Sequence, residues 1–204
     1  MMNNVIRVWD PLVRIFHWSL VLAFAVAYLS GDEENSVHIY SGYIVAGLII
    51  FRLVWGIVGT RYARFSHFIY SPAAVAAYMK DLLAGRPQHH VGHNPAAGWM
   101  IVVLLVTLAV ITVSGLKVYA IEEGLGPLAD GAHSISIISQ ARADSDDDDD
   151  HERHEKAHHD DEEEEFWEEI HEASSNFMLF LIALHVVGVV VSGRLHRENL
   201  VKAM

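Results

Sequence analysis

Four long apolar runs constrain the fold of this chain more than any other feature. They cover residues 12–30, 37–59, 96–116 and 174–193. Each run is close to the roughly 20 residues that an α-helix needs to cross the hydrocarbon core of a bilayer. Hydrophobic residues make up 52% of the sequence, and they cluster in these runs instead of forming amphipathic stripes. The pattern therefore predicts an all-α integral membrane four-helix bundle, with residues 1–204 forming a single membrane domain.

The distribution of basic residues predicts the orientation of the four helices. With the N-terminus inside, the inner segments hold ten lysines and arginines and the outer loops hold four. This bias follows the positive-inside rule, so we expect both termini to be cytoplasmic. Asp10, Pro11 and His17 interrupt the approach to the first run, and a second run follows closely. We therefore expect the first run to be a retained helix and not a cleaved signal peptide.

Histidines within the apolar runs are the candidate functional residues, because a polar ring buried in a membrane needs a partner. The chain has no cysteine, so metal chemistry must use histidine and no covalent c-type haem attachment is available. His171 and His185 are fourteen residues apart, which places them on one face of a helix about 21 Å apart. In the predicted orientation, His17 of the first run lies at the depth of His185, and His38 of the second run lies at the depth of His171.

Two pairs of imidazoles at two levels of a four-helix bundle are suited to binding two haem b groups without covalent bonds. Both axial positions of each iron would come from the protein, which favours electron transfer over reaction with oxygen or substrate. Gly42 and Gly188 each lie about one turn after a candidate ligand, so a flat macrocycle could approach the backbone there. Arg14 and Arg52 are candidate partners of haem propionates, although an arginine near a helix end can instead extend to the lipid surface. The third run contains no histidine and is expected only to complete the bundle.

An acidic tract separates the third and fourth runs. Residues 144–165 hold fourteen acidic residues against Arg153 and Lys156, a net charge of −12 that equals the formal charge of the whole chain. Such a segment cannot be buried, so we expect a solvated, largely disordered periplasmic loop. The loop could bind cations loosely or dock a basic redox protein. The candidate cation ligands in it are His151, His154, His158 and His159.

Two further groups of histidines are weaker candidates for a functional site. The letters HEKAH at residues 154–158 match a zinc-protease motif, but a tract this rich in His and Glu produces the match by chance and offers no third ligand. Five other histidines fall outside the apolar runs, and surface positions are expected for them. They are His67, His89, His90, His93 and His196.

Four segments of the chain are similar to a known family. They are VWDPLVRIFHWSLVLAFAVAY, HIYSGYIVAGLIIFRLVWGIVG, GHNP before the third run, and LHVVGVVVSGRLHRENLVKAM at the end. These segments resemble the bacterial cytochrome b561 family, which includes the b-type cytochrome subunit of nickel-iron hydrogenases. The resemblance implies a dihaem cytochrome of the bacterial inner membrane with four ligands. They are His17, His38, His171 and His185.

The resemblance also implies electron exchange between a periplasmic or membrane-attached protein and the membrane quinone pool. A quinone site is implied by the resemblance alone. The residues that could line it are Arg61, Lys80 and His93. The acidic tract departs from the family, so the outer partner stays open between a hydrogenase-like subunit, a basic c-type cytochrome and a metal ion to be reduced. Beyond these partners we expect contact with membrane lipid and none with nucleic acid.

Two other functions stay open at this point. The protein could be a reductase of small outer substrates, such as metal ions or superoxide, with the acidic loop gathering cations. Alternatively it could be a metal-ion transporter or sensor whose membrane histidines bind the ion directly. A reducible b-type spectrum supports electron transfer or a reductase, and a colourless protein supports a transporter or sensor.

Overall fold

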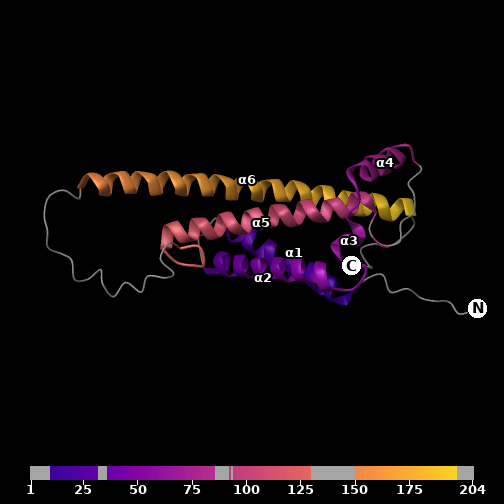
Figure 1. The fold of residues 1–204 in the computed structure, drawn as a ribbon, viewed down its shortest axis with the longest axis horizontal. Coiled ribbons are helices and arrows are strands. Elements are labelled where there is room, and N and C mark those ends of the chain that lie inside the picture. Colours follow the sequence, from indigo (N-terminus) through magenta and orange to yellow (C-terminus); the bar gives the residue numbers. More distant parts are fainter. Residues whose placement is uncertain (1–9, 32–35, 86–91, 93, 130–149, 197–204) are drawn as a thin grey trace, which may run out of the picture. The chain divides into compact units, whose positions relative to one another are not determined.

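The computed structural model describes residues 10–31, 36–85, 92, 94–129 and 150–196, with the side chains of 150–161 and 196 excepted. All regular secondary structure in these residues is helical, which confirms the predicted all-α class. These described residues form six helices, which are labelled in Figure 1. They are α1 (Pro11–Leu29), α2 (Ser36–Val58), α3 (Phe65–Phe68), α4 (Pro72–Leu83), α5 (Pro95–Glu123) and α6 (Asp150–His196).

Four of these helices are long and apolar enough, by length and composition, to cross a membrane. They are α1, α2, α5 and the part of α6 over residues 162–195. The first two begin and end within one residue of the predicted runs. Helix α5 continues past the predicted end at residue 116 to Glu123, because its next glycine is Gly124, which has a positive φ of 64°. A residue in this left-handed conformation is a common end of a helix.

Part of the acidic tract is helical, in place of the disorder expected from its charge. The helix α6 begins at Asp150, so the part of the tract from this residue onward is helical, while residues 144–149 lie outside the described residues. No proline or glycine occurs between Asp150 and Gly188. A helix already formed by the apolar span can extend into such a sequence without a new nucleation step. The predicted cation ligands lie on this helix, but their side chains are outside the described residues, and cation binding by them stays a prediction.

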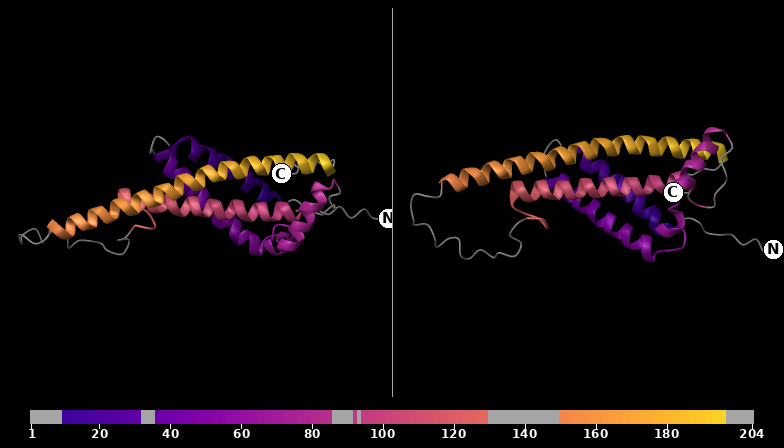
Figure 2. Two further views of the ribbon diagram at one scale, coloured as in Figure 1. Left: turned by 90° about the horizontal axis from the view of Figure 1, so that it is seen from above. Right: turned by 45° about the horizontal axis from the view of Figure 1, so that its top comes forward.

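The chain forms two compact units, and each is described by itself. The first comprises residues 1–109 and 177–204, and the second comprises residues 110–176. Within the first unit, α1 packs beside α2, and α2 also contacts the short helix α3 (Figure 2). Large apolar side chains such as Leu22, Ile50 and Phe180 are exposed on these helices. Exposure of this kind is unfavourable in water and suits contact with lipid.

A buried carboxylate joins the start of α1 to the end of α2. Asp10 is the N-cap of α1 and accepts a 2.8 Å hydrogen bond from the backbone N–H of Leu12. It also accepts hydrogen bonds from Trp55 Nε1 at 3.1 Å and Thr60 Oγ1 at 2.7 Å. Burial by itself raises the pKa of this carboxyl. The hydrogen bonds from Thr60, Leu12 and Trp55 outweigh burial, so the pKa of Asp10 is lowered from its ordinary value of 3.8.

Two glycines make room for α3 in the same unit. A Cβ atom on Gly56 would overlap the ring of Phe65, and a Cβ atom on Gly98 would overlap the backbone oxygen of Phe68. Side chains at these positions would force α3 away from α2 and α5. The close approach places both phenylalanine rings against Arg52, whose guanidinium carbon lies 4.9 Å from the Phe65 ring centre.

Candidate functional site

The structure brings His17 and His185 together in the first unit. His17 comes from α1 and His185 from α6, and their ring centres are 6.5 Å apart with an angle of 52° between the planes. A metal ion bound by two imidazoles at about 2 Å from each nitrogen puts the ring centres roughly 6 Å apart. Both rings are half-buried within apolar helices. The spacing therefore fits one metal ion held between them, as the sequence predicts for this pair.

Neither ring of this pair has a hydrogen bond within the described part of the chain. Nδ1 of His17 is buried and has no partner there, and the ring instead contacts Trp18 edge-on at a centroid distance of 5.3 Å. A buried polar nitrogen without a partner costs about 1–3 kcal/mol. Such a cost is rarely retained without a function, and a ligand between the rings would use one nitrogen of each.

His171 is held differently, by the helix that the sequence analysis expected only to complete the bundle. In the second unit, His171 Nδ1 lies 3.0 Å from the backbone oxygen of Ile111 and 3.2 Å from Ser114 Oγ, both on α5. A carbonyl oxygen can only accept, so Nδ1 carries the proton and the lone pair is on Nε2. This is the usual arrangement of a metal-binding histidine.

A small residue on α5 makes this contact possible. A Cβ atom on Gly115 would lie 2.8 Å from Cε1 of His171, so a larger residue would push the imidazole away. Sequence reasoning missed Ser114 and Gly115, although two adjacent small residues in an apolar helix are a signal of close packing. The accepting oxygen of Ile111 belongs to the backbone and leaves no trace in the residue type.

His38 has the same kind of hydrogen bond within the first unit. Its Nδ1 lies 2.9 Å from the backbone oxygen of Ala27, near the end of α1. The carbonyl oxygen can only accept a hydrogen bond. Nδ1 of His38 therefore carries the proton, and the lone pair is on Nε2. His38 and His171 belong to different units, so their pairing stays a prediction.

The two predicted arginines lie in different surroundings. Arg52 is 3% exposed, and its Nη1 donates to the backbone oxygen of Ala63 at 3.1 Å. Together with the ring of Phe65, this contact fixes a cation inside an apolar helix. Arg14 is exposed in the first turn of α1. Propionate binding by either arginine stays a prediction.

The predicted glycines leave open space beside the candidate ligands. A Cβ atom on Gly42 or on Gly188 would meet no atom within 4 Å. Gly42 lies on the same face of α2 as His38, one turn further along. The open space suits a flat macrocycle next to these helices, and its occupation by haem stays a prediction.

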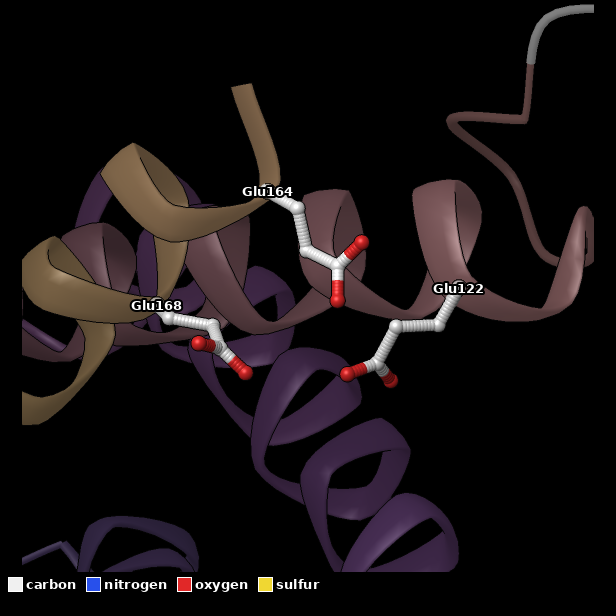
Figure 3. Close-up of side chains that lie close together, drawn as sticks. All are labelled: Glu122, Glu164 and Glu168. Carbon is white, nitrogen blue, oxygen red and sulfur yellow. The ribbon is translucent and has the colours of Figure 1, made fainter. Parts of the chain in front are cut away.

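Three carboxylates of the second unit converge near the turn that precedes His171. Glu122 on α5 and both Glu164 and Glu168 on α6 have carboxylate oxygens within 4.8 Å of one another (Figure 3). Lys117 lies nearby in the sequence, with its Nζ 3.8 Å from Glu163. Exposed acidic groups gather in this way without binding an ion, so we treat the cluster only as a source of negative charge.

The other candidate residues are at the surface or outside the described residues. His67 is exposed and contacts Nε of Arg61 at 2.6 Å, which confirms its predicted surface position. Arg61 and Lys80 are both exposed. His89, His90 and His93, and the side chain of His196, lie outside the described residues. A quinone site near Arg61 and Lys80 stays a prediction.

Comparisons with known proteins agree with the resemblance. The family model of prokaryotic cytochrome b561 matches residues 8–204. The probable Ni/Fe-hydrogenase 1 B-type cytochrome subunit of Escherichia coli (strain K12) is 29% identical over 47% of this chain and 53% of that protein. The probable Ni/Fe-hydrogenase B-type cytochrome subunit of Azotobacter vinelandii is 26% identical over 61% of this chain and 62% of that protein.

The corresponding subunit of Rhizobium leguminosarum bv. viciae is 25% identical over 59% of this chain and 62% of that protein. The chain thus spans between about half and three fifths of the length of these curated relatives. No solved structure matches. Because the family model covers almost the whole sequence, including the four helices that are long and apolar enough to cross a membrane, this chain belongs to the prokaryotic cytochrome b561 family.

Proposed function

We propose that this protein is a dihaem b-type cytochrome that carries electrons across the bacterial inner membrane. The observation that carries the proposal is the pair His17 and His185, whose ring centres lie 6.5 Å apart inside apolar helices, with Nδ1 of His17 buried and without a hydrogen-bond partner among the described residues. His17 and His185 would hold one haem b, which would supply a one-electron carrier when bound. With both imidazoles on the metal, they would also keep substrates away from it.

The second haem would be held by His38 and His171. The support for this pair is their equal predicted depth and their shared protonation at Nδ1, which leaves the lone pair of each ring on Nε2. Open space beside Gly42 and Gly188 suits the macrocycles. Arg52 and Arg14 remain the proposed partners of the propionates.

The direction across the membrane follows from the charges. With both termini in the cytoplasm, ten of the fourteen lysines and arginines lie on the inner side. The His38 and His171 pair then lies toward the periplasm, and the His17 and His185 pair lies toward the cytoplasm. The acidic tract before the last span would then face the periplasm.

The outer partner is proposed from the relatives and from this charge. The relatives are named as cytochrome subunits of Ni/Fe-hydrogenases, which supports a hydrogenase-like partner. The net charge of −12 over residues 144–165 favours a partner with a basic surface, such as a periplasmic c-type cytochrome. The quinone pool is the proposed partner on the membrane side. Membership of a haem-binding family favours electron transfer over a metal-ion transporter.

Haem content of two variants tests the proposal. We expect His185→Ala to lose one haem relative to the wild type, because the remaining imidazole of His17 cannot hold both axial positions. His67→Ala is the matched control, since His67 is an exposed histidine outside the apolar helices, and its haem content should equal that of the wild type. Equal haem content in His185→Ala and His67→Ala would remove His185 from the site.

A further inference from the structure

Helix α4 is an amphipathic helix outside the four candidate spans (Figure 1). It begins at Pro72 and ends at Leu83, in the segment that joins the end of α2 to the start of α5. At about 100° per residue, its larger apolar side chains fall within one arc of about 140°. They are Val75, Tyr78, Met79, Leu82 and Leu83. Lys80 and Asp81 lie outside this arc, so the helix has an apolar side and a polar side.

The apolar arc of α4 has a covered edge and an open edge. Tyr78 is buried, and Val75 and Leu82 are half-buried. Met79 and Leu83, one turn apart along the other edge, are 40% and 84% exposed. Because the first edge already packs on the protein, α4 is held in place, and the open edge needs a further apolar contact to leave water.

The start of α4 is fixed at the level where α5 begins. Trp99, in the second turn of α5, donates from Nε1 to the backbone oxygen of Tyr70 at 2.9 Å, two residues before α4. A Cβ atom on Gly98 would overlap the backbone oxygen of Phe68, so the chain before α4 passes against the first turn of α5. All these residues belong to the first unit. Since α5 is a candidate span, α4 begins near the membrane boundary, where tryptophan is common.

Positive charge predominates around α4. Residues 59–85 hold three cations, all exposed, and one acidic residue, Asp81. The cations are Arg61, Arg64 and Lys80. Lys80 is next to Met79 in the sequence and about 60° from Leu83 around the helix, so it lies beside the open apolar edge. Basic residues within reach of a bilayer surface are attracted to anionic lipid headgroups.

We propose that α4 is an interfacial helix that binds anionic phospholipid. It lies along the membrane surface at which α2 ends and α5 begins, with Met79 and Leu83 at the boundary between headgroups and acyl chains and Lys80 at the phosphate groups. Helices with an apolar face and a basic edge bind bilayers in this way and insert about 5–10 Å. The proposal goes beyond the proposed function and rests on the membrane spans, not on haem ligation.

The bilayer fits this open edge better than another protein does. Ile57 and Val58, in the last turn of α2, and Ile69, between α3 and α4, are also exposed. Exposed apolar side chains therefore continue along the chain from the candidate span α2 to α4. The basic edge next to them matches the negative headgroup layer, and the membrane is already present at this level of the molecule.

Fluorescence quenching by brominated lipid tests the depth of the open edge. The chain has no cysteine, so a single introduced cysteine takes one bimane label. Full-length Met79→Cys, Leu83→Cys and Ala77→Cys are reconstituted in phosphatidylcholine with or without bromine on the acyl chains. Ala77 is the matched control, because it is exposed and about 200° around α4 from Met79. We expect quenching at positions 79 and 83 to be at least about threefold greater than at 77, since only the open edge would reach the acyl chains.

Other patterns of quenching would overturn the proposal. Equal quenching at all three positions contradicts the orientation of α4, and no quenching at 79 and 83 puts the open edge outside the bilayer. A label at 83 that neither brominated lipid nor aqueous iodide reaches would put a protein contact there instead. Each variant is compared with itself in unbrominated lipid, so quenching by a bound haem cancels and the result does not depend on haem content.

The choice of anionic lipid is tested with the Leu83→Cys label. Brominated phosphatidylglycerol is compared with the same fraction of brominated phosphatidylcholine in unbrominated phosphatidylcholine. We expect about fivefold enrichment of phosphatidylglycerol beside α4, equivalent to about 1 kcal/mol for one cation near an anionic surface. Adding Lys80→Gln should remove most of it. Lys117→Gln, near the other end of α5, is the matched control and should leave it unchanged. No enrichment, or an equal loss in both variants, would exclude anionic lipid as the ligand.

Discussion

His17 and His171 are both half-buried imidazoles on membrane-spanning helices, yet their surroundings are opposite. Nδ1 of His17 has no partner in the described chain, whereas Nδ1 of His171 bonds to a backbone oxygen and a hydroxyl on the neighbouring helix. The first ring can still change the nitrogen that carries its proton, and the second cannot. A membrane histidine can thus be presented to a metal in two ways, and the difference lies in the neighbouring helix.

The largest change in haem content is expected from a substitution on α5, at the point where this helix contacts the ring of His171. Gly115→Ala would place a Cβ atom 2.8 Å from the His171 imidazole, so the ring must move and its hydrogen bond to Ile111 should break. We expect the variant to lose the haem of the His38 and His171 centre and keep the other. Haem content per chain and the reduced spectrum measure the loss.

Gly47→Ala is the control for this substitution. Gly47 is nine residues after His38, hence on the opposite face of α2, and a Cβ atom there meets nothing within 4 Å. Its haem content should match the wild type. Full haem content in Gly115→Ala would show that the close contact with His171 does not support binding.

A smaller effect is expected from the acidic tract, whose charge would act only on the outer pair. Replacing the aspartates at 146–149 with asparagine removes four negative charges from the net −12. Reduction by a basic c-type cytochrome should slow about tenfold at low ionic strength, because steering by charge weakens. Stopped-flow rates measure the change. The difference should vanish near 1 M salt, where the Debye length is about 3 Å. An equal slowing at both salt concentrations would exclude charge steering.

The smallest effect is expected on the stability of the first unit, from a substitution of Asp10, the carboxylate that joins α1 to α2. Asp10→Asn keeps the size of the side chain but weakens three hydrogen bonds, so the free energy of unfolding should fall by about 1–2 kcal/mol. The folded-state pKa of Asp10 is lowered, so its stabilising effect is present above the ordinary value of 3.8 and is lost as the pH falls below it. Thermal unfolding in detergent at pH 7 and pH 3 measures both effects.

Asp81→Asn on α4 is the control for this variant. The stability gap between the wild type and Asp10→Asn should narrow at pH 3, since the carboxyl of the unfolded wild-type chain is then largely protonated. A gap that widens on acidification would contradict the lowered pKa of Asp10. Neither variant should change haem content, because neither Asp10 nor Asp81 is one of the proposed haem ligands.

The sequence predicted the helices well because hydrophobic length is a direct requirement of the membrane. It predicted the meeting of His17 and His185 for the same reason, since helix geometry and orientation fix depth. It missed the contacts of His171, because Ile111 contributes a backbone oxygen and Gly115 contributes only the lack of a side chain. The helical start of α6 at Asp150 was also missed, because charge composition reports solvation but not the continuity of a helix with its apolar span.

The haem content of the purified wild-type chain tests the central claim most directly. Two pairs of histidines at two depths require two haem b groups per polypeptide, with a reducible b-type spectrum. We expect a haem-to-protein ratio of two from the pyridine haemochrome assay and quantitative amino-acid analysis. A ratio of one would leave one proposed pair without a haem, and a colourless protein would contradict haem ligation by all four histidines.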